Sequence, residues 1–186
     1  MQEEAQEALT YALRHCHMKA KRNKALILKY LVPVGLLLGR LPSKALSQHY
    51  AGILKPYIPF ANALKSGNIG VFHECMDTQR NQLIKDGTYL LLEKLQGAVY
   101  RRLLRKVWAI HAQQDPSKAA QIPLSMFQQA LEIAGVKIEM DEIECIAANL
   151  IARKYVKGYI SHKAKIMVVA KTDPFPPLSM VTLNES

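Results

Sequence analysis

Within Tyr155-Val-Lys-Gly-Tyr-Ile-Ser-His-Lys-Ala-Lys-Ile-Met-Val-Val-Ala170, the hydrophobic pattern changes from a helical period to alternation, and this change indicates the class of fold. Residues 155–161 and 165–170 are rich in Val, Ile and Tyr, and His162-Lys163-Ala164 separates the two runs. Short runs of β-branched and aromatic residues joined by a tight turn favour a β-hairpin. We therefore predict two antiparallel strands near the end of an otherwise helical chain.

Three helical patterns precede this hairpin. The longest covers residues 88–113, with apolar side chains at 3.6-residue spacing. The next begins at Ser125, a predicted N-cap, and stops at Gly135. The third covers residues 141–154, with Asp141 as its predicted cap. Three helices followed by a hairpin make the plan of a winged helix. The prolines within Asp173-Pro-Phe-Pro-Pro-Leu178 cannot extend a sheet, so this segment is predicted to pack as an irregular strap.

The first half of the chain reads as short helices joined by small turns, without a clean repeat period. Ala25 to Gly39 is apolar and predicts a buried pair of helices that Pro33 ends or kinks. Ser43 is a predicted cap of the helix that follows. The predicted fold class is therefore mainly α, with a helical-repeat part over residues 1–113, a winged helix over 114–178 and a tail over 179–186.

Composition supports a folded, basic protein. Apolar residues make up 49% of the chain, and 25 Lys and Arg against 15 Asp and Glu give a net charge of +10. This charge favours acidic partners, either nucleic acid or protein, although ordinary solubility also explains it. Three widely spaced cysteines predict neither a disulfide framework nor a zinc module, which favours a reducing compartment. No signal peptide and no membrane-spanning segment is expected.

Catalytic motifs are missing from the sequence. It contains no glycine-rich phosphate loop, no GxSxG and no HExxH. The cluster His15-Cys16-His17 has no second ligand pair at useful spacing. His73, Glu74 and Cys75 are more typical of a solvated helix face. We therefore predict that the protein is not an enzyme and holds no metal or cofactor.

Basic residues form the main candidate site. Lysines and arginines can follow a phosphate backbone without contacting bases. The cluster around residues 19–24 more simply caps a buried helix, whereas the hairpin projects from the body. The predicted nucleic-acid contacts are Arg153, Lys154, Lys157, His162, Lys163 and Lys165 at the winged-helix end, with Arg101 and Arg105 on the long helix. Contact with protein partners is the alternative.

Sequence-specific reading of DNA is disfavoured. The helix in the recognition position starts Asp141-Glu-Ile-Glu144, and carboxylates there would approach phosphates and be repelled. Binding without sequence preference, to RNA or DNA, is the better hypothesis. The predicted partner contacts are the aromatic residues Trp108, Tyr155, Tyr159 and Phe175, with interior packing as the alternative for Trp108 and base stacking for the two tyrosines.

Several segments of the sequence resemble those of a known family. Helical repeats that run into a winged helix resemble the PCI domain of proteasome-lid, signalosome and initiation-factor subunits. Residues 21–34 with Leu36-Leu-Leu-Gly39, Glu142–Ile146 with Asn149–Ile151, Val156–His162 and Asp173–Leu178 resemble the PCI subunit of the TREX-two mRNA export complex. Gly35 stands where this family usually has a basic residue. Its members usually carry more repeats upstream, so the chain is expected to be a fragment or a short form.

The resemblance implies a function. It implies a scaffold role in a nuclear complex that couples transcription to mRNA export, with the nuclear pore as one expected location. It also implies two protein partners, a large helical scaffold subunit and a small acidic disordered subunit that clasps the winged helix. A PCI interaction module in a signalosome-like or proteasome-lid-like particle, without a nucleic-acid role, is the alternative. A free winged-helix transcription factor is a third hypothesis.

Overall fold

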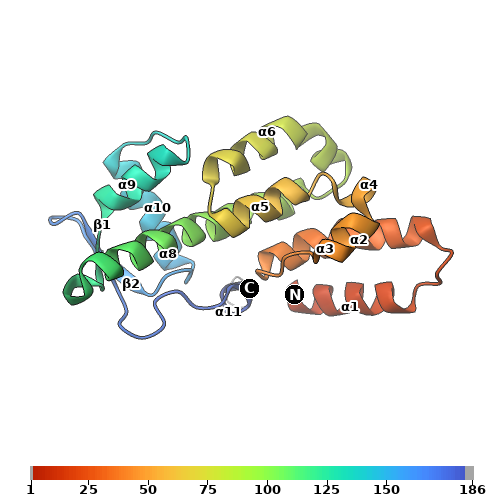
Figure 1. Ribbon diagram of the computed structural model, residues 1–186, viewed down its shortest axis with the longest axis horizontal. Coiled ribbons are helices and arrows are strands. Elements are labelled where there is room, and N and C mark those ends of the chain that lie inside the picture. Colours follow the sequence, from red (N-terminus) through yellow and green to blue (C-terminus); the bar gives the residue numbers. More distant parts are fainter. Residues whose placement is uncertain (1, 183–186) are drawn as a thin grey trace.

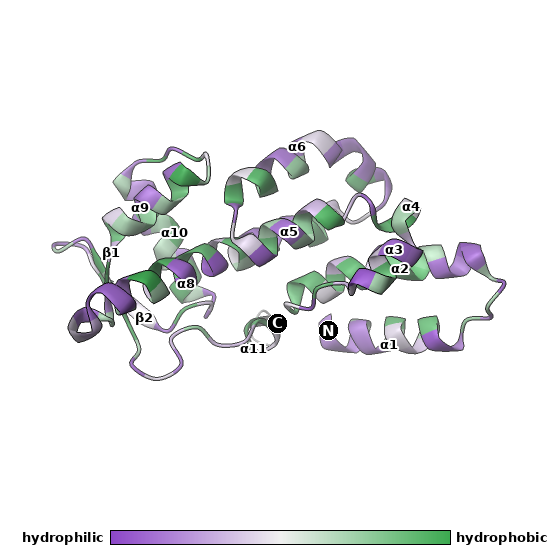
Figure 2. Cartoon of the chain, viewed as in Figure 1, coloured by the Kyte–Doolittle hydropathy of each residue, from purple (hydrophilic) through white to green (hydrophobic). Residues whose placement is uncertain are grey.

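A computed structural model describes residues 2–182, in which eight helices build an elongated body with a small winged helix at one end (Figure 1). The body contains α1 Gln2–His15, α2 Lys21–Leu37, α3 Lys44–His49, α4 Ala51–Leu54, α5 Ile58–Ser66, α6 Ile69–Lys85, α7 Tyr89–Glu93 and α8 Gln96–Gln114. Helix α8 runs from the middle of the molecule to the winged helix, with α5 and α6 packed along it. Hydrophobic and hydrophilic residues are interspersed along these helices, as expected for elements that bury one side (Figure 2).

The winged helix follows α8. Its elements are the 3-10 turn η1 Pro116–Lys118, β1 Gln121–Pro123, α9 Leu124–Ile133, α10 Met140–Ala152, β2 Gly158–Ser161, β3 Ile166–Val169 and, after the strap, α11 Leu178–Thr182. The three strands form an antiparallel sheet in the order β1-β3-β2. The predicted hairpin and fold class are confirmed, whereas β1 was not predicted. Most of the predicted tail, residues 183–186, lies outside the described part of the chain.

Two helix predictions in the body were wrong. Pro33 lies inside a single helix, α2, because the seven residues from Leu31 to Leu37 are all buried and their burial outweighs one lost backbone hydrogen bond. The predicted long helix breaks into α7 and α8, where the Leu95 N–H donates to the Leu92 carbonyl in a 3-10 turn. This tighter turn lets both leucines be completely buried.

The helix caps were predicted with mixed success. Ser43 caps α3 by accepting a hydrogen bond from the Leu46 N–H, as predicted. Ser125 does not cap α9, because the helix starts directly from β1 and its first N–H, at Leu124, donates to the Lys165 carbonyl. Asp141 lies within the first turn of α10 instead of capping it, where its charge still favours the helix dipole.

Candidate partner and nucleic-acid interface

The winged helix is held against the body through two glycines. A Cβ atom on Gly70, at the start of α6, would lie 2.0 Å from the Ala134 carbonyl oxygen at the end of α9. A Cβ atom on Gly97, at the start of α8, would lie 2.9 Å from Cε2 of Tyr155. Both distances are shorter than any ordinary van der Waals contact. The winged helix therefore sits at a fixed position on the body, and this position determines which of its residues face outward.

The strap, residues 173–178, makes a second connection. Nη2 of Arg101 donates to the carbonyl oxygens of Phe175 and Pro176, at 3.0 Å and 2.5 Å. The ring of Phe175 packs on Trp108, with ring centroids 5.6 Å apart. Burial, with the neighbouring charges of Arg105 and Arg102, lowers the pKa of Arg101 to about 10, so this side chain remains charged at neutral pH.

The predicted exposure of Arg101 was wrong, since only 5% of this residue is exposed. The buried face of α8 carries Leu104 and His111, and Ile110 is 52% exposed. Arg101 therefore points under the strap and cannot contact a nucleic acid while the strap is in place. Arg105, one helical turn on, is exposed as predicted.

The four predicted partner contacts divide into two groups. Tyr155 and Phe175 are 3% and 7% exposed, so both are internal packing residues and their prediction as surface contacts was wrong. Each seals the junction between the winged helix and α8, where burying an aromatic ring is more favourable than exposing it. Trp108 is half-buried against Phe175, which matches the interior alternative. Tyr159 on β2 is 63% exposed and is the one available for contact.

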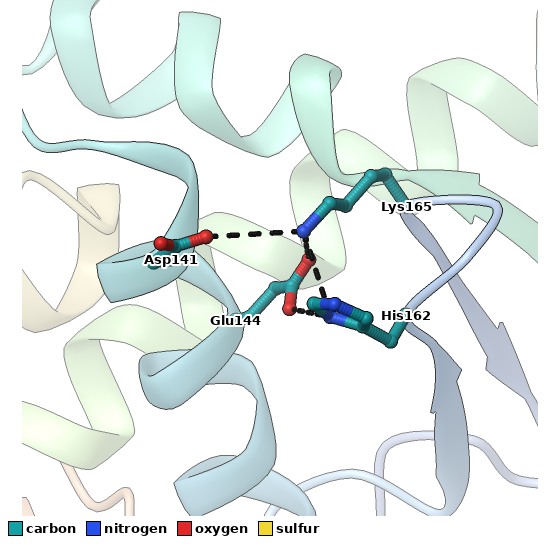
Figure 3. Close-up of polar contacts among 4 residues, drawn as sticks. All are labelled: Asp141, Glu144, His162 and Lys165. Atoms are coloured by element: carbon teal, nitrogen blue, oxygen red, sulfur yellow. Dashed lines mark hydrogen bonds and ion pairs between the residues drawn. The ribbon is translucent and has the colours of Figure 1, made fainter.

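An acidic pair on α10 binds the tip of the hairpin (Figure 3). Glu144 forms an ion pair with Nζ of Lys165 at 2.5 Å and lies 2.6 Å from Nδ1 of His162, while Asp141 lies 3.8 Å from Lys165. Hydrogen bonds from Lys165 and then His162 lower the pKa of Glu144. The stabilisation from these contacts is therefore fully present at pH values above the ordinary carboxyl pKa. It is lost as the pH falls through the lowered pKa of Glu144.

The remaining basic residues of the winged helix differ in how they are paired. Lys157 forms an ion pair with Asp173 of the strap at 2.9 Å. Arg153, Lys154 and Lys163 are exposed, and none has a carboxylate within ion-pair distance among residues 2–182. These three cations, with Tyr159, are the free part of the predicted basic surface. We call Arg153, Lys154 and Lys163 the open wing cations.

One side of the recognition helix faces the body. Glu142, Ile146 and Asn149 of α10, with Arg153 directly after the helix, line a hollow of about 460 Å³ together with residues of α7 and α8. A helix that reads DNA must enter the major groove with its N-terminal part free. On α10 that part is acidic and partly turned toward α8, which disfavours the transcription-factor hypothesis.

Other site classes find no support in the described residues. Within residues 2–182, no three His, Cys, Asp or Glu side chains lie close enough together to hold a metal ion. In the same part of the chain, every helix is too short or too polar to cross a membrane. His73 donates to or accepts from Gln96 at 3.0 Å, and burial lowers its pKa, which fits a neutral packing residue.

Comparisons with known proteins identify one matching domain family and several similar proteins. The PCI domain profile matches residues 62–171, which run from α5 to just beyond β3. Over 94% of its length, the chain is 39% identical to Enhanced ethylene response protein 5 of Arabidopsis thaliana. Over 95% of its length, it is 44% identical to the PCI domain-containing protein 2 homolog of Drosophila melanogaster. Over 92% of its length, it is 38% identical to the Protein CSN12 homolog of Schizosaccharomyces pombe. The matched part covers only 42%, 43% and 40% of the lengths of these three relatives, in the same order.

Proposed function

The chain belongs to the PCI domain family, and on this premise we propose that it is a non-catalytic scaffold subunit of a nuclear mRNA export complex. Its expected partners are a large helical scaffold subunit and a small acidic disordered subunit, as the resemblance of its PCI segments to the TREX-two subunit implies. The relatives named PCI domain-containing protein 2 support this assignment within the family. Its proposed location is the nucleus, with the nuclear pore as one site.

A second part of the proposal is weak binding of RNA or DNA without sequence preference. The observation that carries it is the exposure of the open wing cations on a winged helix whose position is fixed by the body. Unpaired Lys and Arg release counterions from phosphates when they bind, so they supply affinity without base contacts. The acidic start of α10 makes this form of binding more favourable than insertion into the major groove.

Charge reversal tests this surface. The double variant Lys154→Glu and Lys163→Glu should weaken binding of a random single-stranded RNA and reduce the slope of log affinity against log salt by about 1.4, since each lost phosphate contact removes about 0.7. Fluorescence anisotropy at several salt concentrations measures both quantities. The matched control, Lys21→Glu with Lys44→Glu, changes the net charge equally at two helix starts away from the wing. Equal slopes in the two double variants would contradict the assignment.

Removing a negative charge from the acidic pair on α10 should strengthen RNA binding, the opposite effect. Glu144→Gln removes one negative charge and releases Lys165 and His162 from their carboxylate partner. We expect about twofold to fivefold tighter binding of the same RNA and a salt slope steeper by up to about one. A Glu144→Gln variant that binds no more tightly than the unchanged protein would mean that the hairpin tip does not contact the nucleic acid.

The alternative is a PCI interaction module of a signalosome-like or proteasome-lid-like particle, without a nucleic-acid role. The name of one relative, Protein CSN12 homolog, favours it. The two roles differ in the RNA measurement above, because the alternative predicts no salt-dependent binding that the open wing cations control.

A further inference from the structure

A hollow of about 340 Å³ lies between the body and the strap. Its walls are the end of α2 with the residues that follow it, the end of α5, the middle of α8 and Pro177 with Leu178 at the end of the strap. The hairpin contributes none of its lining residues. We call it the strap hollow. Its volume falls within the range of about 300–1,000 Å³ that is usual for small-molecule sites.

The charged lining of the strap hollow is entirely positive. It consists of Lys65, Arg101, Arg102 and Arg105. The three arginines lie within about one turn of α8, so their guanidinium groups are neighbours. Burial first, and then the charges of Arg105 and Arg102, lower the pKa of Arg101. A bound anion would relieve this repulsion between like charges.

Two of these arginines are held in position by backbone carbonyl groups. Nη2 of Arg101 donates to the carbonyl oxygens of Phe175 and Pro176, and Nε of Arg102 donates to that of Lys65 at 3.1 Å. Nε of Arg101 is buried and has no acceptor among the described residues, which is costly for a charged group. Fixed guanidinium groups with unused donors suit phosphate, because arginine can donate two parallel hydrogen bonds to it. The strap hollow therefore offers preorganised phosphate-binding groups.

The apolar part of the lining selects among anions. Leu38, Leu64 and Leu178 are buried, Leu41 is 43% exposed, and no aromatic residue is among the lining residues. Single-stranded nucleic acids are usually held by stacking of their bases on aromatic rings, which leucine does not provide. Extended peptides commonly add a strand to a sheet edge, but the walls here are helices and the proline-rich strap. A compact aliphatic molecule that carries several phosphate groups fits both the cations and the leucines.

We propose that the strap hollow binds a small, multiply phosphorylated aliphatic molecule of the inositol phosphate class, with phosphates on Arg102, Arg105 and Lys65. Its carbon ring would lie against the exposed part of Leu41. The same chemistry occurs in a free inositol phosphate and in the headgroup of a phosphoinositide lipid. The site shares no residue with the open wing cations, and it depends neither on the scaffold role nor on nucleic-acid binding. Because the strap forms one wall, a bound ligand would hold the strap against α8.

Isothermal titration calorimetry of the purified chain with inositol hexakisphosphate tests this proposal. We expect one bound ligand per chain, and Arg105→Glu should weaken binding at least about fivefold, since repulsion replaces attraction at an exposed contact. The matched control Lys137→Glu makes the same charge change in the exposed α9–α10 loop and should weaken binding less than about twofold. The ligand should also raise the melting temperature of Lys137→Glu more than that of Arg105→Glu.

A vesicle experiment distinguishes the two sources of the ligand. Phosphatidylcholine vesicles with and without phosphatidylinositol bisphosphate are sedimented in the presence of the protein. Recruitment that needs the phosphoinositide and is lost in Arg105→Glu would support a lipid headgroup as the ligand. Binding of inositol hexakisphosphate without recruitment to these vesicles would support a soluble ligand.

Three results would overturn the proposal. The first is equal weakening by Arg105→Glu and Lys137→Glu, which would indicate general attraction to a chain of net charge +10. The second is a glutamate-rich peptide that binds more tightly than inositol hexakisphosphate and is lost in Arg105→Glu, which would assign the hollow to an acidic protein. The third is loss of RNA binding in Arg105→Glu with inositol hexakisphosphate binding unchanged, which would assign it to nucleic acid.

The Lys154→Glu and Lys163→Glu variant separates this proposal from the proposed function. It should lose affinity for RNA and bind inositol hexakisphosphate within about twofold of the unchanged protein, because the open wing cations do not line the strap hollow. RNA binding that fails while inositol hexakisphosphate still depends on Arg105 would overturn only the nucleic-acid role. The reverse result would overturn only the site in the strap hollow.

Discussion

Arg101→Ala is expected to lower the free energy of unfolding by about 3 kcal/mol and the melting temperature by about 6–12 °C. The substitution leaves the carbonyls of Phe175 and Pro176 buried without their donor and opens a space below the strap. Removing a hydrogen bond to a charged group costs more than removing a neutral one, and here one side chain makes two. Urea and thermal unfolding followed by circular dichroism measure the change.

Arg105→Ala is the control for this prediction. Arg105 lies one helical turn from Arg101 on α8 but is exposed, so its removal should alter stability by no more than about 0.5 kcal/mol. Arg101→Lys keeps the charge but cannot reproduce the planar guanidinium, so an intermediate loss is expected. If Arg101→Ala and Arg105→Ala unfold at the same temperature, Arg101 does not fasten the strap.

Gly70→Ala is expected to destabilise the protein by about 3 kcal/mol, although alanine normally has a higher helix propensity than glycine. The reason is the 2.0 Å distance between the added Cβ and the Ala134 carbonyl oxygen, which forces α6 and α9 apart. Urea unfolding measures the loss, and hydrogen exchange should locate it at the junction between the body and the winged helix.

Gly52→Ala provides the matched control, because a Cβ atom at Gly52 in α4 meets nothing within 4 Å. There the ordinary helix preference should apply, and stability should be unchanged or rise by up to about 1 kcal/mol. A Gly70→Ala protein as stable as Gly52→Ala would show that the winged helix is not packed tightly on the body.

The winged helix could be predicted because its signals are local. Alternation in residues 155–170 marks the hairpin, and glycine at position 135 marks the end of α9. Strand β1 has three residues, too few for a periodic pattern, and it is defined by its pairing with β3. The break after α7 depends on the burial of both Leu92 and Leu95, and this burial cannot be predicted from the local sequence pattern.

The candidate site could be predicted only as a set of basic residues. Whether each cation is free depends on partners distant in the sequence: Asp173 for Lys157, and Glu144 for Lys165. The position of Arg101 could not be inferred either, because a charged residue is normally placed outside and its acceptors are backbone carbonyls of the strap.

We propose above that this chain is a scaffold subunit of a nuclear mRNA export complex. The most direct test is to tag the chain in cells, purify it from nuclear extract and identify the co-purifying proteins by mass spectrometry, with the Gly70→Ala variant purified in parallel to reveal contacts that need the intact junction. We expect recovery of a large helical export scaffold and a small acidic subunit, both in smaller amounts with Gly70→Ala. Recovery of signalosome or proteasome-lid subunits alone would contradict the proposed function.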